Sequence, residues 1–307
     1  MSAPAHLRLG TRGSLLARTQ SGQIAERLRQ SNPGLNVELI TVSTSGDRLI
    51  DRPLSDAGGK GLFTKELELA LLANEIDLAV HSLKDVPVTM PLVDQADLTI
   101  AAVPVREDAR DCLVSRRYKS LAELPQGATV GTGSLRRRCQ ILQARPDLTI
   151  APLRGNIDTR LRKLDSGQYD AIVLAMAGLK RIGRWEAAWM TPIEFSQILP
   201  AAGQGALALQ CRRADRAVIG ILEGINHPET ADAVAAERAV VAGLGGDCHS
   251  PIAVWATVDP TRITLSAAVG ASGGQTPVAY ASASAPRHLW QQAVESICRT
   301  FASPRAN

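Results

Sequence analysis

The chain has 307 residues, of which 45% are hydrophobic and 21% charged, and its formal net charge is +4. A single hydrophobic core rarely supports more than about 250 to 300 residues, so we expect two or three domains. No apolar run approaches the ~20 residues that a membrane span needs, which argues against a membrane protein. The N-terminus lacks a basic start followed by an apolar stretch of about 7 to 15 residues, so we expect a cytoplasmic protein.

In the first third of the chain, short apolar runs alternate with helical patterns, which is typical of α/β units. We expect strands at 7–11, 36–42, 77–82 and 98–103. A helix should begin after Ser14, whose side chain suits an N-cap, and end before Pro33 and Gly34. A loop rich in Gly, Asp and Pro ends in the GGKG of 58–61, and an amphipathic helix follows from Leu62 to about Ala73.

The same alternation begins again after the first third and predicts a second α/β lobe. The expected strands are 112–115, 128–132, 148–153 and 170–178, with helices that begin near Ser134 and Asn156. A strand-like run at 199–212 could return to the first lobe. From about Ala214 the pattern changes to two helices, strands at 251–258, 262–269 and 277–285, and a last helix from about Arg287.

These patterns predict an α/β protein of two periplasmic-binding-protein-like lobes with mainly parallel sheets, plus a small C-terminal α+β domain. We place the first lobe at 1–101 and 197–219, the second at 102–196, and the C-terminal domain at 220–307.

The five cysteines are an odd number, lie far apart and form no CxxC motif. This spacing argues against a disulfide framework and against a structural zinc site, so most are expected to be small buried side chains. Cys248 is unusual because it lies in the glycine-rich stretch GLGGDCHSPIA, although a buried inert cysteine is the ordinary interpretation. His81 and His249 are too isolated to predict a metal site.

Basic residues are concentrated in one segment. Between Ala128 and Leu164 there are eight basic residues and two acidic ones, a local net charge of +6, which leaves −2 for the rest of the chain. Such a region inside a nearly neutral protein indicates an anionic ligand.

Several of these cations follow predicted strands, where ligands bind in open α/β sheets. Arginine presents a planar fork that matches a carboxylate or phosphate, whereas a lone arginine on a helix is most often only solvated. The hydroxyl residues beside them could equally be simple helix caps. The candidates at strand ends are Arg12, Ser14, Thr132, Ser134, Arg136, Arg137, Arg154, Arg160 and Arg181.

The motif HSLKDVP (81–87) places Ser82, Lys84 and Asp85 at another strand end. Taken alone, Asp85 could be a turn aspartate paired with Lys84. Among arginines, however, its carboxylate would stay ionised and could stabilise a developing cation, which makes Asp85 a catalytic candidate.

Eight motifs in order give the chain a close resemblance to the porphobilinogen deaminase (hydroxymethylbilane synthase) family. They are TRGSLLA, GGKGLFTKELE, HSLKDVP, GTGSLRRRCQ, LRGNIDTRL, LAMAGLKRIG, LPAAGQGAL and GGDCHSPIA. The resemblance implies a transferase of heme and other tetrapyrrole biosynthesis that joins four porphobilinogen molecules head to tail, with loss of ammonia, and then releases linear hydroxymethylbilane by hydrolysis. It also implies a monomer that binds neither nucleic acid nor membrane.

By the same resemblance, Cys248 carries a dipyrromethane cofactor through a thioether bond. The catalytic residues implied are Asp85, Lys84, Arg12 and Arg154. Those implied for the cofactor are Ser82, Lys84, Thr132, Ser134, Arg136, Arg137 and Arg160. Those implied for substrate are Arg12, Ser14, Gln20, Lys60, Phe63, Arg154, Arg160 and Arg181. Lys60 and Phe63 belong to a region similar to the family's mobile loop, about 48–61, and no metal is implied.

Two residues depart from the family pattern. Gly133 stands where many members have serine, and Arg138 extends an arginine pair to a triplet and is not assigned to the site. Two other hypotheses stay open on the residues alone. One is a cytosolic two-lobed binding protein for a small polycarboxylate. The other is a nucleic-acid-binding regulator, suggested by the pI of 8.9 and the arginine triplet.

Overall fold

The computed structural model describes residues 6–44, 64–88, 97–247 and 249–302. Lys60, Phe63, Cys248 and the predicted loop at 48–61 lie outside these residues. The chain forms two compact units, Met1–Arg106 with Ala206–Ala231, and Glu107–Gly205 with Asp232–Asn307. The predicted three-domain boundaries stay a prediction.

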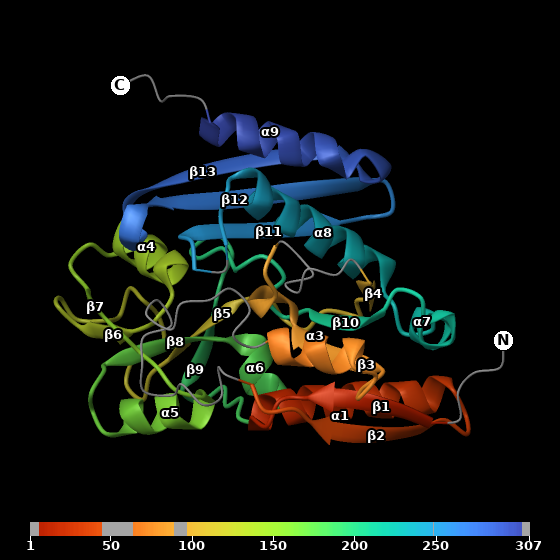
Figure 1. The fold of residues 1–307 in the computed structure, drawn as a ribbon. Helices are drawn as coiled ribbons and strands as arrows, with labels where there is room; N and C mark the ends of the chain where they lie inside the picture. Colours follow the sequence, from red (N-terminus) through yellow and green to blue (C-terminus); the bar gives the residue numbers. More distant parts are fainter. Residues whose placement is uncertain (1–5, 45–63, 89–96, 248, 303–307) are drawn as a thin grey trace. The chain divides into compact units, whose positions relative to one another are not determined.

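The first unit is built on a five-stranded sheet with the order β2-β1-β3-β10-β4 (Figure 1). Its strands are β1 (His6–Thr11), β2 (Asn36–Thr41), β3 (Leu78–Ser82), β4 (Leu98–Ala102) and β10 (Leu207–Arg212). β1 pairs in parallel with β2 and β3, whereas β10 is antiparallel to both β3 and β4. Four strands therefore run in one direction, and the run at 199–212 does return to the first sheet, through its last six residues.

Within the described ranges, this sheet is accompanied by the helices α1 (Leu15–Ser31), α3 (Lys65–Leu72) and α7 (Arg216–Glu223). Ser14 caps α1 as predicted, because its Oγ accepts a hydrogen bond from the Ala17 amide at 3.3 Å. The buried face of α1, with Ile24 and Leu28, packs with Leu7 and Leu9 of β1 into one core. Burial of such side chains contributes about 1.5 to 3 kcal/mol each and holds α1 against β1.

The second unit contains a sheet of the same kind, ordered β7-β6-β8-β5-β9. The strands are β5 (Asp111–Val114), β6 (Thr129–Gly131), β7 (Thr149–Ala151), β8 (Ala171–Ala175) and β9 (Met190–Ile193), and the helices are α4 (Leu135–Ala144), α5 (Ile157–Asp165) and α6 (Met176–Arg181). β6 is parallel to β7 and β8, and β5 is antiparallel to β8 and β9. Both sheets thus carry one reversed strand in the fourth position.

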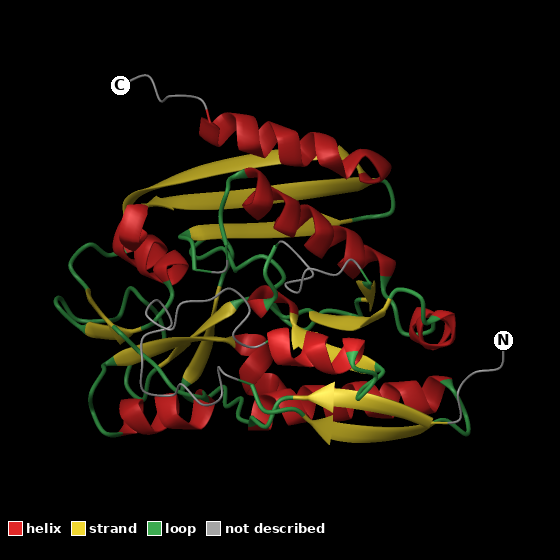
Figure 2. Ribbon diagram, viewed as in Figure 1, coloured by secondary structure: helices red, strands yellow, loops and turns green. Residues whose placement is uncertain are grey.

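The C-terminal part of the second unit is a three-stranded antiparallel sheet with helices (Figure 2). It consists of β11 (Ile252–Val258), β12 (Arg262–Ala271), β13 (Gln275–Pro286), α8 (Pro228–Gly243) and α9 (Trp290–Ala302). Phe195 and Trp255 stack with ring centroids 4.4 Å apart, next to a cluster that joins Cys139 of α4 to Ala268 of β12.

The α/β class, the mainly parallel strand directions and the small C-terminal α+β part are therefore confirmed. Two details of the prediction are wrong. The run 170–178 is a strand only to Ala175, because α6 begins at Met176, and β9 was not predicted. Among the helices in the described ranges, none is both long and apolar enough to span a bilayer.

Candidate functional site

In the first unit, the predicted residues gather where two parallel strands end. β1 and β3 are neighbours with Gly10 beside Ala79, so the residues that follow Thr11 and those that follow His81 lie at the same edge. Arg12 comes directly after β1, and Ser82 ends β3. The register alone brings these two segments together, as expected for parallel strands.

A pair of hydrogen-bonding side chains fixes this edge. The buried amide of Gln20 on α1 lies 2.9 Å (Nε2) and 3.2 Å (Oε1) from the hydroxyl of Ser82. Because Gln20 is anchored in the helix that Ser14 caps, it ties the end of β3 to α1. Ser14, Gln20 and Ser82 are therefore brought to one small region of the first unit.

Asp85 lies just beyond this edge, on a short 3₁₀ turn (Leu83–Asp85). Leu83 is buried and its amide donates to the carbonyl of Ala206, which holds the turn against the segment that leads into β10. Asp85 itself is exposed, and its carboxylate makes no hydrogen bond or ion pair with any residue in the described ranges. A turn aspartate held by Lys84 is thus not what the geometry shows; the carboxylate is available to a ligand.

Behind this edge a chain of three buried polar side chains crosses the sheet. His81 Nε2 lies 2.9 Å from Gln210 Oε1, and Gln210 Nε2 donates to Glu68 Oε1 at 3.0 Å. Because the Gln210 amide gives its N–H to Glu68, its oxygen faces the imidazole, and His81 carries its proton on Nε2. Burial lowers the pKa of His81 to about 4, with the nearby charge of Arg12 acting in the same direction, although the hydrogen bond that His81 donates to Gln210 opposes it.

In the second unit, the corresponding edge is formed by β6, β7 and β8. Thr132 follows β6, and Ser134 is the N-cap of α4, with its Oγ 3.4 Å from the amide of Arg137. Thr132 Oγ1 accepts a hydrogen bond from the Ser134 amide at 3.2 Å. Both hydroxyls therefore have structural roles in starting α4, as the capping alternative predicts. Their assignment to cofactor binding stays a prediction.

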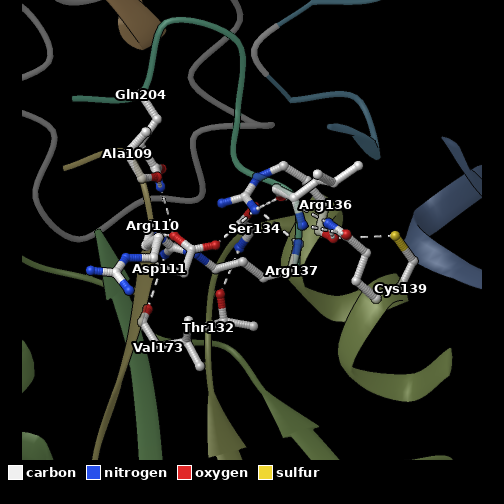
Figure 3. Close-up of polar contacts among 12 residues, drawn as sticks. Ala109, Arg110, Asp111, Thr132, Ser134, Arg136, Arg137, Cys139, Val173 and Gln204 are labelled. Atoms are coloured by element: carbon white, nitrogen blue, oxygen red, sulfur yellow. Dashed lines mark hydrogen bonds and ion pairs between the residues drawn. The ribbon is translucent and has the colours of Figure 1, made fainter. Parts of the chain in front are cut away.

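Arg136 and Arg137 lie deep beneath this edge, at 4% and 6% exposure. Both bind one carboxylate, that of Asp111 at the start of β5 (Figure 3). Arg136 Nη1 donates to Oδ2 at 2.8 Å, and Arg137 donates to Oδ1 through Nε at 3.1 Å and Nη2 at 2.8 Å. Although burial by itself raises the pKa of Asp111, the two guanidinium groups outweigh it and hold that pKa far below its usual range.

The remaining predicted arginines lie on the same unit in different settings. Arg154 follows β7, and its guanidinium makes no hydrogen bond or ion pair within the part of the chain that the structure describes. Arg160 Nε donates to the Gly155 carbonyl at 2.7 Å, and Arg181 Nη2 donates to the Gly205 carbonyl at 2.7 Å. Of these three, Arg154 is the cation with all its donors available to an anion.

Four cysteines can be assessed as nucleophiles. Burial raises the thiol pKa of Cys112 to about 12 and that of Cys211 to about 11, and it also raises the pKa of Cys139 and of Cys298. The thiolate is the reactive form, so none of these four is activated.

The fold and these edges define an α/β protein whose strand ends, within the described ranges, carry several arginines and the exposed carboxylate of Asp85. Family models agree with this description and extend it. "Porphobilinogen deaminase, dipyromethane cofactor binding domain" matches residues 7–220, and "Porphobilinogen deaminase, C-terminal domain" matches residues 231–289. The chain belongs to the porphobilinogen deaminase family, and its cofactor is dipyrromethane.

Several solved structures are also similar to the chain. The BvgS VFT2 domain of Bordetella pertussis is 17% identical, over 76% of this chain and 93% of that one, with a TM-score of 0.41. The methionine-binding protein MetQ is 17% identical, over 76% and 95%, with a TM-score of 0.44. The alkanesulfonate-binding protein SsuA from Xanthomonas axonopodis pv. citri is 17% identical, over 78% and 75%, with a TM-score of 0.36. The family assignment rests on the two family models.

The donor set of the second unit fits the family's cofactor. Each ring of a dipyrromethane made from porphobilinogen carries two carboxylates, and the Arg136, Arg137 and Asp111 cluster holds one more positive charge than negative. Arg154 adds a second cation that is not neutralised by a described acid. Burying an excess charge is costly unless an anion balances it, so this set suits a polycarboxylate.

The sequence analysis missed Asp111, Gln204 and the His81, Gln210 and Glu68 chain. The one sequence signal for Asp111 was its place at the start of a four-residue strand whose other three residues, Cys112 to Val114, are apolar. The link between Gln210 and His81 had no local signal, because it joins residues 129 positions apart.

Proposed function

We propose that the chain is a transferase that condenses four porphobilinogen molecules head to tail on bound dipyrromethane, then releases linear hydroxymethylbilane by hydrolysis. The observation that carries this proposal is the match of both family models to consecutive parts of the chain, 7–220 and 231–289. Each addition removes one ammonia from the aminomethyl group of a porphobilinogen and one proton from the pyrrole carbon to which its methylene becomes bonded. When bound, dipyrromethane supplies the first pyrrole to be extended.

We infer that Cys248 anchors the cofactor through its sulfur. The raised thiol pKa of each of the other four cysteines supports this, because an alkylated cysteine must first be a nucleophile. Cys248 is also the only cysteine within the glycine-rich motif that resembles the family's attachment site.

Asp85 is proposed as the residue that stabilises charge. When ammonia leaves porphobilinogen, positive charge develops on the substrate's pyrrole nitrogen, and a carboxylate that accepts a hydrogen bond from that N–H lowers the barrier. The same carboxylate can accept the proton released after coupling. Its lack of any partner among the described residues supports this role, since no protein group has to be displaced.

Arg12, Arg154, Arg160 and Arg181 are proposed to hold the acetate and propionate groups of the substrate. One guanidinium and one carboxylate about 4 Å apart near a protein surface attract by about 4 kcal/mol before desolvation is subtracted. Every added ring brings two more carboxylates, so several fixed cations are needed. The local net charge of +6 between Ala128 and Leu164 supports the assignment of Arg154 and Arg160, which lie in that segment.

Intact-mass measurement of the purified chain, together with a porphobilinogen turnover assay, tests the proposal. We expect an added mass corresponding to two porphobilinogen-derived rings, present in Cys298→Ser and absent from Cys248→Ser. Cys298 is the matched control because it is the least buried of the described cysteines. A wild-type chain with unmodified mass and no turnover, produced in cells that make porphobilinogen, would favour the polycarboxylate-binding protein instead.

A further inference from the structure

One buried carboxylate in the second unit organises two of the predicted cofactor-binding arginines. We propose that Asp111 is a positioning residue: it fixes Arg137 rigidly and holds Arg136 by one nitrogen only, so that the other nitrogens of Arg136 face a carboxylate of dipyrromethane. This inference rests on the proposed function.

The hydrogen bonds of Arg137 leave it no freedom to turn. Its Nε and Nη2 bind Asp111 Oδ1, and its Nη1 donates to the Val173 carbonyl at 3.0 Å. All three side-chain nitrogens therefore have acceptors, which are supplied by Asp111 of β5 and Val173 of β8. Arg137 therefore serves mainly to hold the carboxylate.

Arg136 is held differently. Its two hydrogen bonds both come from Nη1, to Asp111 Oδ2 at 2.8 Å and to the Leu199 carbonyl at 2.6 Å. Nε and Nη2 have no acceptor within the ranges that the structure describes, although the side chain is only 4% exposed. Among the described residues, neither nitrogen is sealed off from solvent without a partner, so the small exposed part of Arg136 can be reached from outside. A carboxylate ligand can accept charge-assisted hydrogen bonds from both nitrogens at once.

Asp111 is itself held in one orientation. Gln204 Nε2 donates to Asp111 Oδ1 at 2.9 Å and to the Ala109 carbonyl at 2.7 Å, which ties the carboxylate to the backbone just before β5. Figure 3 shows the carboxylate between Gln204 and the two guanidinium groups. The orientation of Arg136 is thus set by a residue that need not touch the cofactor.

A second cluster in the first unit also has one aspartate between two arginines, but its charge balance and its environment differ. Asp77 binds Arg8 and Arg212 with N···O distances of 2.8 and 2.9 Å. Arg212 also pairs with Asp215 at 3.1 Å, so two aspartates balance the two arginines. The side chain of Arg8 is in addition 35% exposed, compared with 4% for Arg136 and 7% for Arg137. The Asp77 cluster therefore needs no ligand, which makes it the matched control for a purely structural role.

The test measures how fast adduct-free protein, produced in cells that make no porphobilinogen, gains the cofactor mass when incubated with porphobilinogen. We expect Asp111→Asn to slow loading about tenfold or more, the loss that follows when a charge-assisted hydrogen bond is misaligned. Asp77→Asn should gain the cofactor at a rate within about twofold of the wild-type rate, because distant sites act independently. This should hold even if the substitution lowers the midpoint of unfolding. Arg136→Met should load slowly while staying folded, since it leaves Asp111 paired with Arg137.

A double-mutant comparison separates positioning from stability. If Asp111 acts through Arg136, Asp111→Asn slows loading no further once Arg136 is methionine, whereas a merely structural role gives additive losses. Loading of folded Asp111→Asn at the wild-type rate overturns the inference. If Asp111→Asn does not fold, Gln204→Met decides, because it frees the carboxylate without changing any charge; an unchanged loading rate then overturns the inference. A wild-type chain that gains no mass instead refutes the proposed function.

Discussion

His81 offers a direct test of the buried chain behind the first-unit edge. Folding keeps this imidazole neutral, because burial lowers its pKa from 6.5 to about 4, whereas in the unfolded chain it titrates at its ordinary value. The stability that the neutral His81 contributes is therefore fully present above pH 6.5 and is lost progressively as the pH falls toward 4, where the folded form must also take up the proton. We expect replacement of His81 by Gln, which can still bind Gln210, to remove this pH dependence.

The magnitude follows from the two pKa values. The pKa of His81 differs by about 2.5 between the unfolded and the folded chain. At 1.36 kcal/mol per pKa unit, protonation of this group can change the free energy of unfolding by about 3 kcal/mol in total. Between pH 7.5 and pH 5.0, the unfolded chain becomes almost fully protonated at this site while the folded chain does not, and the free energy of unfolding should fall by about 2 kcal/mol from this group alone.

Urea unfolding of wild type, His81→Gln and His288→Gln at these two pH values measures the effect. His288 is exposed in the C-terminal part and controls for the loss of a histidine as such. The drop between pH 7.5 and 5.0 should be about 2 kcal/mol smaller in His81→Gln than in the other two proteins. An equal drop in all three would show that His81 is not held neutral by its surroundings, and the argument from burial would fail.

Two further predictions concern single carboxylates. Asp85→Ala should leave a folded chain that still carries the cofactor mass but loses at least about 100-fold in turnover, with kcat affected more than KM, because charge stabilisation and not binding is removed; near-normal kcat would reject the assigned role. In Asp77, desolvation raises the pKa but hydrogen bonds from Arg8 and Arg212 outweigh it and lower the pKa from 3.8 to about 2. Its contribution of about 2 kcal/mol should therefore be present above pH 4 and lost between pH 4 and pH 2. Asp77→Asn should unfold with a shallower acid dependence over that interval, and an identical acid profile for the two proteins would contradict this.

Most helices and strands could be predicted from the sequence because local residue patterns encode them. The Ser14 cap and the apolar spacing of 15–31 define α1, and the short apolar runs define most strands. β9 was missed because its four residues contain Pro192 and follow a stretch with aromatic and polar residues that gives no period-two signal. Such a strand forms because β5 offers it an antiparallel partner, which is a tertiary cause.

The site was predicted unevenly for a similar reason. Residues directly after strands, such as Arg12 and Asp85, were found because strand ends define where ligands meet an α/β sheet. Asp111 and Gln210 were not found, because their importance lies in partners far along the chain. The sequence shows that Arg136 and Arg137 are charged and adjacent on a helix, but it does not show that both side chains are buried.

The reversed strand in each sheet has a consequence for the growing polypeptide. In the second sheet that strand, β5, is made before its four companions, whereas in the first sheet it is β10, made after every one of them. During synthesis β3 and β4 must wait, with their facing edges unpaired, until the whole of the second sheet has left the ribosome. The first sheet is thus the first to begin and closes only after the second is complete, so its unpaired strand edges need protection from aggregation in the meantime.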